Sequence, residues 1–233
     1  MSWAARRSQP PSEAESLVPT ITVLAGTNGA GKTSIGGAKL AAEKIPFYNP
    51  DVETRLLLAN NPALSAEEAN AAAWRIGKER LEAAIAERQS FNFETTLGGA
   101  TIARLLVKAH EAGLRVRMWY CGLTSVELHI ARVRSRVRYG GHDIPEAKIR
   151  ERYDKSRNNL CMILPSLDEL VLYDNSAEGD PHVGVPPQPV LLLQYRDRAI
   201  VHLASVMPEW AKPIAAVALV QATGGARNNP DLP

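Results

Sequence analysis

Short apolar runs alternate with longer helical segments along most of this chain. The apolar runs are rich in β-branched and aromatic residues, which favour strands; they cover Thr20–Ala25, Ile45–Asn49, Ser90–Thr96, Arg115–Leu123 and Leu167–Tyr173. The segments between them have helical character; they cover 32–44, 52–59, 65–88, 101–112, 126–138 and 145–164. Strands separated by helices of this length predict an α/β fold with a mostly parallel central sheet and right-handed crossovers.

The helix from Ser65 to about Arg88 has the strongest signals. Ser65 and Glu68 form a capping box, in which each side chain accepts a hydrogen bond from the backbone N–H of the other residue. Leu81 and Ile85 then stand four residues apart on one face, with Glu and Arg on the other faces. This segment is therefore predicted to be a long amphipathic helix.

The C-terminal part of the chain has a different pattern. Val190–Tyr195 and Ala199–Leu203 predict a hairpin that adds antiparallel strands at the edge of the sheet. Both chain ends are polar or turn-forming, and such ends are usually poorly ordered. We therefore expect a disordered N-terminal tail over 1–18, one domain over 19–212 and a C-terminal tail over 213–233.

Composition narrows the class of protein further. The chain has 233 residues, enough for one α/β domain with a full core, and its net charge of 27 − 25 = +2 is too small to indicate nucleic-acid or membrane binding. Its apolar run Ile214–Ala222 is too short to span a bilayer. Cys121 and Cys161 are expected to be buried and reduced, which is typical of a cytoplasmic protein.

One glycine-rich stretch has a recognisable chemistry. Gly26–Thr33, with the sequence GTNGAGKT, matches the P-loop pattern G-x-x-x-x-G-K-[ST] and lies between a predicted strand and a predicted helix, as the motif requires. Its backbone N–H groups would surround a phosphate, Lys32 would reach the β- and γ-phosphates, and Thr33 would hold Mg²⁺. A glycine-rich turn between two core elements is the alternative. The residues expected to bind ATP here are Gly26, Thr27, Asn28, Gly29, Ala30, Gly31, Lys32, Thr33 and Ser34.

Polar residues end or follow three other predicted strands, at the sheet edge where parallel sheets bind ligands. Asp51 either caps the helix that begins there or accepts the proton of a hydroxyl that attacks the γ-phosphate. Glu94 would coordinate Mg²⁺ through water or bind a substrate hydroxyl, while strand-end hydrogen bonding is the alternative for Thr95 and Thr96 beside it. Asn175 lies where an adenine ring would be contacted, although a plain turn also explains it.

Arginines concentrate in the two helices before the last parallel strand. They are Arg132, Arg134, Arg136, Arg138, Arg150, Arg152 and Arg157. Helical spacing prevents the first four from facing one ligand. The break at Gly140-Gly141 favours a hinged helical lid whose arginines meet the triphosphate during transfer, with a salt-bridged, solvated surface as the alternative. Interleaved acidic residues and the lack of an aromatic stacking platform make nucleic-acid binding the weaker interpretation.

Five segments together resemble the zeta toxin family of P-loop kinases. They are AGTNGAGKTS, YNPDVE, FNFETTLGG, RVRSRVRYGGHDIPEAKIRERYDKSRNNL and LYDNS, in family order between about 19 and 210. The resemblance implies a three-layer P-loop NTPase/kinase fold. It also implies an ATP-dependent kinase that phosphorylates the 3′-hydroxyl of the sugar in UDP-N-acetylglucosamine and thereby blocks cell-wall precursor synthesis. The sugar-nucleotide pocket of the better-known toxins is not recognisable beyond the ETT segment, and a protein antitoxin as partner cannot be read from this chain.

The resemblance also implies residue roles and cofactors. It assigns Lys32 and Thr33 to ATP and Mg²⁺, and Asp51 to the general base. The remaining implied roles are sugar-nucleotide binding by Glu94 with Thr95 or Thr96, and γ-phosphate binding by Arg136 with either Arg150 or Arg152. Two other hypotheses stay open at this point: an ATP-binding interaction module without small-molecule transfer, and a kinase for another acceptor such as a polynucleotide end.

Overall fold

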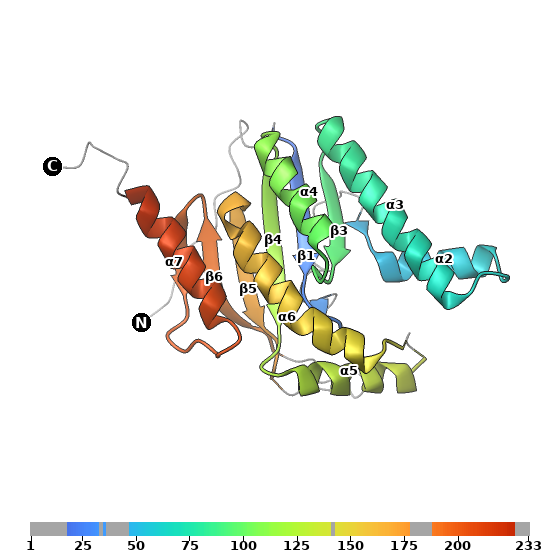
Figure 1. Cartoon of the computed structure of the whole chain (residues 1–233). Coiled ribbons are helices and arrows are strands. Elements are labelled where there is room, and N and C mark those ends of the chain that lie inside the picture. Colours follow the sequence, from blue (N-terminus) through green and yellow to red (C-terminus); the bar gives the residue numbers. More distant parts are fainter. Residues whose placement is uncertain (1–17, 33–34, 36–46, 141–142, 178–187, 227–233) are drawn as a thin grey trace, which may run out of the picture.

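The computed structural model describes residues 18–32, 35, 47–140, 143–177 and 188–226. Its strands form one seven-stranded sheet in the order β2-β3-β1-β4-β5-β6-β7 (Figure 1). The strands are β1 Thr20–Ala25, β2 Phe47–Tyr48, β3 Phe91–Thr95, β4 Arg115–Gly122, β5 Glu169–Asp174, β6 Val190–Arg196 and β7 Ala199–Leu203. The first five are parallel, and β6 and β7 are antiparallel. The predicted α/β fold, its mostly parallel sheet and its C-terminal edge hairpin are confirmed.

The described helices lie close to their predicted positions. They are α2 Pro50–Asn60, α3 Ala66–Ala86, α4 Ala100–Glu111, α5 Val126–Arg138, α6 Glu146–Ile163 with the 3₁₀ turn Leu164–Ser166, and α7 Lys212–Ala226. Helices α3, α4, α6 and α7 cover one face of the sheet, whereas α5 lies beyond the end of the strands (Figure 1). The helix predicted over 32–44 falls outside the described residues, apart from Lys32 and Ile35.

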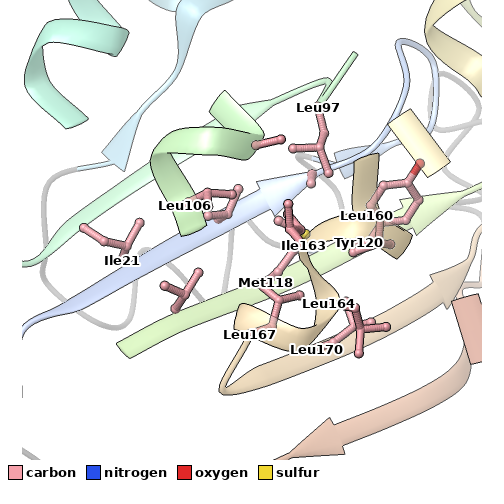
Figure 2. Close-up of a cluster of buried hydrophobic side chains, with 14 of the residues drawn as sticks. Ile21, Leu97, Leu106, Met118, Tyr120, Leu160, Ile163, Leu164, Leu167 and Leu170 are labelled. Atoms are coloured by element: carbon pink, nitrogen blue, oxygen red, sulfur yellow. The ribbon is translucent and has the colours of Figure 1, made fainter. Parts of the chain in front are cut away.

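The main core fills the space between the sheet and the covering helices. Alternate residues of a strand point to the same face, so Val116, Met118 and Tyr120 of β4 all face α4 and α6 and are fully buried or nearly so. Leu160 and Ile163 meet them from α6 (Figure 2). This core fixes the sheet and its helices as one support for the loops at the carboxyl ends of the strands.

Helix caps define how the chain leaves β2. The side chain of Asn49 accepts hydrogen bonds from the backbone N–H groups of Asp51 at 2.8 Å and Val52 at 3.3 Å. Asn49 is therefore the N-cap of α2, and the alternative in which Asp51 caps this helix is wrong. The capping box of Ser65 and Glu68 at the start of α3 is confirmed.

Two expectations about buried residues need correction. The described part of the predicted C-terminal tail is α7, whose Ile214 and Ala218 are fully buried in the main core. Its apolar residues are there to pack against the domain. Cys121 is buried as expected, but Cys161 is half-buried. Within the described ranges, no helix combines the length and apolar character needed to cross a bilayer.

Candidate active site

The P-loop adopts a conformation that side chains would prevent. Gly26 has φ of 139°, and a Cβ placed there would lie 2.1 Å from the carbonyl oxygen of Cys121. Gly31 has φ of 80°, and its Cβ would lie 2.3 Å from Nδ2 of Asn175. Only glycine tolerates both the backbone angles and the close approach. The described part of the loop therefore has the tight path that the motif predicts; Thr33 and Ser34 lie outside the described residues.

Three side chains hold the loop, from β4, from α5 and from the residue that follows β5. The Cys121 thiol and the Asn175 amide both donate to the carbonyl oxygen of Ala30, each at 2.9 Å. Nδ1 of His129 lies 2.8 Å from the carbonyl oxygen of Asn28, and since a carbonyl only accepts, Nδ1 carries the hydrogen. Burial raises the pKa of the Cys121 thiol to about 12, so the thiol is protonated at neutral pH and serves as a donor.

The position of Asn175 bears on its predicted role. Its side chain is almost fully buried and braces the loop from beneath, and it also lines the cleft. Bracing accounts for the amide N–H, whereas Oδ1 of Asn175 is buried and has no hydrogen-bond partner within the described residues. Contact between Asn175 and the adenine ring stays a prediction.

His129 makes the stability of the fold depend on pH. Burial, aided by the nearby charges of Lys32 and Arg132, lowers the pKa of His129 to about 4, although the hydrogen bond to Asn28 favours the protonated form. The unfolded chain takes up this proton near the ordinary pKa of 6.5. The free energy of unfolding should therefore fall as the pH drops from about 6.5 to 4, by at most about 1.4 kcal/mol per pH unit from this group. Above that window His129 adds no pH dependence.

Denaturant unfolding between pH 4.5 and 7.5 measures this effect. We expect His129→Gln to flatten the pH dependence relative to the wild type. The matched control is His202→Gln, because His202 is exposed on β7 and its removal should leave the slope unchanged. Equal slopes for the wild type and His129→Gln would contradict the assignment.

A chain of contacts links the P-loop lysine to Asp51. Nζ of Lys32 donates to the carbonyl oxygen of Gly26 at 2.8 Å and lies 3.4 Å from Oε1 of Glu94. Oε2 of Glu94 accepts from Nδ2 of Asn49 at 3.2 Å, and Oδ1 of Asn49 accepts from the backbone N–H of Asp51. Because Asn49 both caps α2 and binds Glu94, the ends of β1, β2 and β3 are joined at one place.

Lys32, Glu94 and Asp51 line a single cleft of about 990 Å³. Asp51 is exposed in it, and its Oδ2 lies 3.7 Å from a guanidinium nitrogen of Arg136 on α5. The two side chains are 50% and 40% exposed, so both are accessible to a ligand. The cleft thus has the lysine of the P-loop and a solvent-accessible carboxylate in its walls, which is the arrangement expected for phosphoryl transfer to a hydroxyl.

The two arginines that the sequence leaves as alternatives are placed differently. Arg152 lines the cleft, and its guanidinium donates to Oδ1 of Asn28 in the P-loop at 2.8 Å. Arg150 is exposed and pairs with Glu146 at 2.8 Å and Glu127 at 3.0 Å, and the cleft walls do not include it. Geometry therefore favours Arg152 as the second arginine of the lid.

The other arginines of α5 and α6 divide between the cleft and the surface. Arg132 lines the cleft and donates to the carbonyl oxygen of Ala177 at 3.0 Å. Arg134 pairs with Glu146 at 2.7 Å on the exposed side. Arg157 lies over the ring of Tyr153, 3.9 Å from its centroid. The expectation that the four arginines of α5 cannot all face one ligand agrees with this arrangement, because Arg132 and Arg136 line the cleft and Arg134 does not.

Thr95 and Thr96 both line the cleft beside Glu94. Oγ1 of Thr95 accepts from the backbone N–H of Leu97 at 3.0 Å, so the strand-end interpretation applies to this residue. The backbone carbonyl of Thr96 accepts from the Ser156 hydroxyl at 2.7 Å, which leaves the Thr96 side chain on the cleft wall. Substrate binding by either threonine stays a prediction.

Magnesium would need few protein ligands here. Within the part of the chain that the structure describes, no three His, Cys, Asp or Glu side chains are grouped to hold a metal ion. P-loop proteins bind Mg²⁺ mainly through the phosphates, water and one or two side chains. The nearly buried carboxylate of Glu94, 3.4 Å from Lys32, fits that chemistry.

Sequence reasoning missed the wall of the cleft formed by α3. Asn70, Trp74, Gly77 and Lys78 all line it. Their spacing puts them on one face of the helix, but nothing local to the sequence shows that this face borders the cleft. Asn49 was also missed, although Asn before a helical Pro-Asp pair is a recognisable cap signal.

Comparison with protein families shows which family the chain belongs to. The model of the family described as Zeta toxin matches residues 4–178 of the chain. The chain belongs to the zeta toxin family. A curated relative from Haemophilus influenzae, described only as an uncharacterized protein, is 33% identical over 128 residues, which are 55% of this chain and 88% of the relative.

Solved structures show the same fold for this zeta toxin family member. The AvrRxo1-ORF1:AvrRxo1-ORF2 complex with sulphate ions matches with a TM-score of 0.63 at 18% identity over 88% of this chain, and a structure of that complex with ATP matches with a TM-score of 0.62. The present chain covers 65% of those chains, just under two thirds of their length. The PezAT toxin–antitoxin system of Streptococcus pneumoniae matches with a TM-score of 0.50 at 16% identity, over 94% of this chain and 90% of that one. The α/β P-loop fold is thereby confirmed.

Proposed function

We propose that this protein is an ATP-dependent kinase that transfers the γ-phosphoryl group of ATP to a sugar hydroxyl of a sugar nucleotide, with the 3′-hydroxyl of UDP-N-acetylglucosamine as acceptor. Membership of the zeta toxin family supports a P-loop kinase. The observation that carries the proposal is the contact chain from Lys32 through Glu94 and Asn49 to Asp51. It supports a donor site and an acceptor site that face each other across one cleft.

On the donor side, the P-loop N–H groups and Lys32 would bind the β- and γ-phosphates of ATP. Arg152 would approach the same phosphates from α6, because its guanidinium already contacts the Asn28 side chain. Mg²⁺ would be held by Thr33 and by Glu94, directly or through water, and would neutralise charge on the β- and γ-phosphates. ATP is bound in one of the AvrRxo1 complexes, which is consistent with this donor.

On the acceptor side, Asp51 would act as the general base. Its carboxylate would accept the proton of the sugar hydroxyl as that oxygen bonds to the γ-phosphorus, while the bond from the γ-phosphorus to the bridging oxygen breaks and ADP leaves. Arg136, 3.7 Å from Asp51, would stabilise charge on the transferring group. Catalysis would rest on positioning and charge stabilisation, since a loose transition state needs little covalent chemistry from the protein.

A protein partner and a cytoplasmic location stay predictions. The AvrRxo1 structures contain two different proteins, and PezAT is a toxin–antitoxin system. Both relatives support a search for a protein antitoxin that binds this chain.

Incubation of the purified protein with Mg²⁺, γ-labelled ATP and a panel of acceptors tests the proposal. We expect the label to appear in UDP-N-acetylglucosamine, with mass spectrometry showing one added phosphoryl group on the sugar. Lys32→Ala should yield no product, because it removes the charge that binds the β- and γ-phosphates. The panel includes other sugar nucleotides and an oligonucleotide with a free 5′-hydroxyl.

The outcomes separate the competing functions. Label in the oligonucleotide alone would show a polynucleotide kinase and contradict the sugar-nucleotide proposal. ATP binding without any labelled product would contradict the kinase proposal and favour a nucleotide-dependent interaction module.

A further inference from the structure

An exposed tryptophan forms part of the cleft wall. Trp74 lies on α3 and is 49% exposed, whereas Trp119 and Trp210 are only 7% and 4% exposed. A large aromatic ring in contact with water inside a cleft gains free energy when another flat apolar surface covers it. The exposed position of Trp74 in the cleft wall is therefore suited to stacking against a flat ring of a ligand.

The helix that carries Trp74 is firmly anchored. Its capping box fixes the N-terminus, and Gly77 lets the helix pack directly on Tyr48, since a Cβ at Gly77 would lie 2.5 Å from the tyrosine ring. The Tyr48 hydroxyl donates to the carbonyl oxygen of Ala73. An aromatic ring on such a support is pre-organised, so little ordering is needed when a ligand stacks on it.

Polar groups flank Trp74 on the same face. Asn70 lies one turn before it and Lys78 one turn after it, and both line the cleft. Lys78 pairs with Glu82 at 2.8 Å along the helix, and its side chain is 30% exposed. An amide and an ammonium group on either side of an indole suit a planar polar ring that is linked to an anionic group.

The topology puts Trp74 on the acceptor side of the cleft. The sheet order runs β2-β3-β1-β4-β5, and α3 precedes β3 in the chain and packs with α2, which carries Asp51 (Figure 1). Asn175 follows β5, on the opposite side of the P-loop strand. A ring that stacks on Trp74 would thus belong to the molecule that Asp51 deprotonates.

We infer that Trp74, with Asn70 and Lys78, forms a subsite for the heterocyclic base of a nucleotide-containing acceptor, with the acceptor phosphates towards Lys78. This inference rests on the proposed function, because it takes the Asp51 side of the cleft as the acceptor site. According to this inference, both the base and the sugar of the acceptor contribute to its binding free energy.

Calorimetry with the donor site saturated by Mg²⁺ and a non-hydrolysable ATP analogue tests this subsite. The probes are UDP-N-acetylglucosamine, UMP, AMP and N-acetylglucosamine-1-phosphate. We expect Trp74→Ala to weaken binding of UDP-N-acetylglucosamine and UMP roughly tenfold or more, the usual effect of losing one base–aromatic stack. Affinity for the base-free sugar phosphate should not change, and neither should affinity for the ATP analogue, which is titrated separately into the protein with an empty donor site. Trp74→Phe should keep most of the affinity, and Arg75→Ala, next along the same helix, is the control outside the cleft.

Each outcome supports or overturns the subsite. A loss confined to AMP supports it and indicates an adenine-containing acceptor. The subsite would be overturned if Trp74→Ala left all affinities unchanged, or if it weakened binding of N-acetylglucosamine-1-phosphate equally. It would also be overturned if Trp74→Ala weakened binding of the ATP analogue instead, or if the wild type bound none of the base-containing probes. Phosphoryl transfer is assayed separately. If base binding depends on Trp74 but no phosphoryl group is transferred, the proposed function alone is contradicted. If transfer occurs but binding does not depend on Trp74, the subsite alone is contradicted.

Discussion

Asp51→Asn is expected to lower kcat by about 10²- to 10⁴-fold, the usual contribution of a general base. The asparagine side chain has nearly the same shape but cannot accept the proton of the attacking hydroxyl. Asp51 contributes only its backbone N–H to the Asn49 cap, so α2 should form normally. ATP affinity should be unchanged, because the phosphates would bind to the P-loop and Lys32. Steady-state kinetics together with ATP binding by calorimetry measure both effects.

Glu53→Gln is the matched control for this substitution. Glu53 is the other acidic residue in the first turn of α2, so its substitution makes the same change of charge near the same helix end. Glu53 is not part of the cleft wall, and kcat should stay close to the wild-type value. If Asp51→Asn kept near-native turnover while binding both substrates, the base would have to be another group.

Arg136→Ala is expected to lower kcat by about 10³-fold or more, as loss of an arginine that stabilises the transferring phosphoryl group does. The KM for ATP should change much less, because this contact is strongest in the transition state. Arg136 is suited to the role because it meets Asp51 in the cleft at 3.7 Å and is still 40% exposed. Arg136→Lys should recover little of the loss, since an ammonium lacks the planar fork that binds two phosphate oxygens.

Arg150→Ala, on the neighbouring helix α6, provides the comparison. Arg150 is exposed and is already paired with Glu127 and Glu146, and exposed pairs of this kind contribute little to stability. We expect kcat to stay close to the wild-type value, because Arg150 is not part of the cleft wall. A kcat for Arg136→Ala as high as that of Arg150→Ala would place Arg136 among the solvated arginines and remove it from the mechanism.

Local signals in the sequence predicted much of the fold. The P-loop between β1 and the following segment, the capping box of α3, and the helix Val126–Arg138 were all predicted with their observed positions. Each depends on residues close together in the chain: glycines in a turn, a cap three residues from its partner, or apolar residues at helical spacing. The spacing of residues in the sequence is enough to predict such interactions.

Errors arose where packing, and not local pattern, decides the outcome. Residues from 213 onward looked like a tail, yet Ile214 and Ala218 of α7 are fully buried against the domain. Asp51 and Asn49 are both good caps, and the choice of Asn49 depends on where β2 ends and on its second contact with Glu94. The preference for Arg152 over Arg150 likewise depends on which face of α6 meets the P-loop.

The sequence by itself determined that this chain has a phosphate-binding loop, a mostly parallel sheet and a set of carboxylates and arginines suited to phosphoryl transfer, because those features follow from residue type and short-range spacing. The tertiary structure alone decided which of these groups share a cleft. It joined Lys32 to Asp51 through Glu94 and Asn49, paired Arg150 with Glu146 outside the cleft, and placed Trp74 in the wall of the same cleft. The physical reason is that strand order and helix packing bring together residues far apart in the chain, and no local periodicity records those long-range contacts.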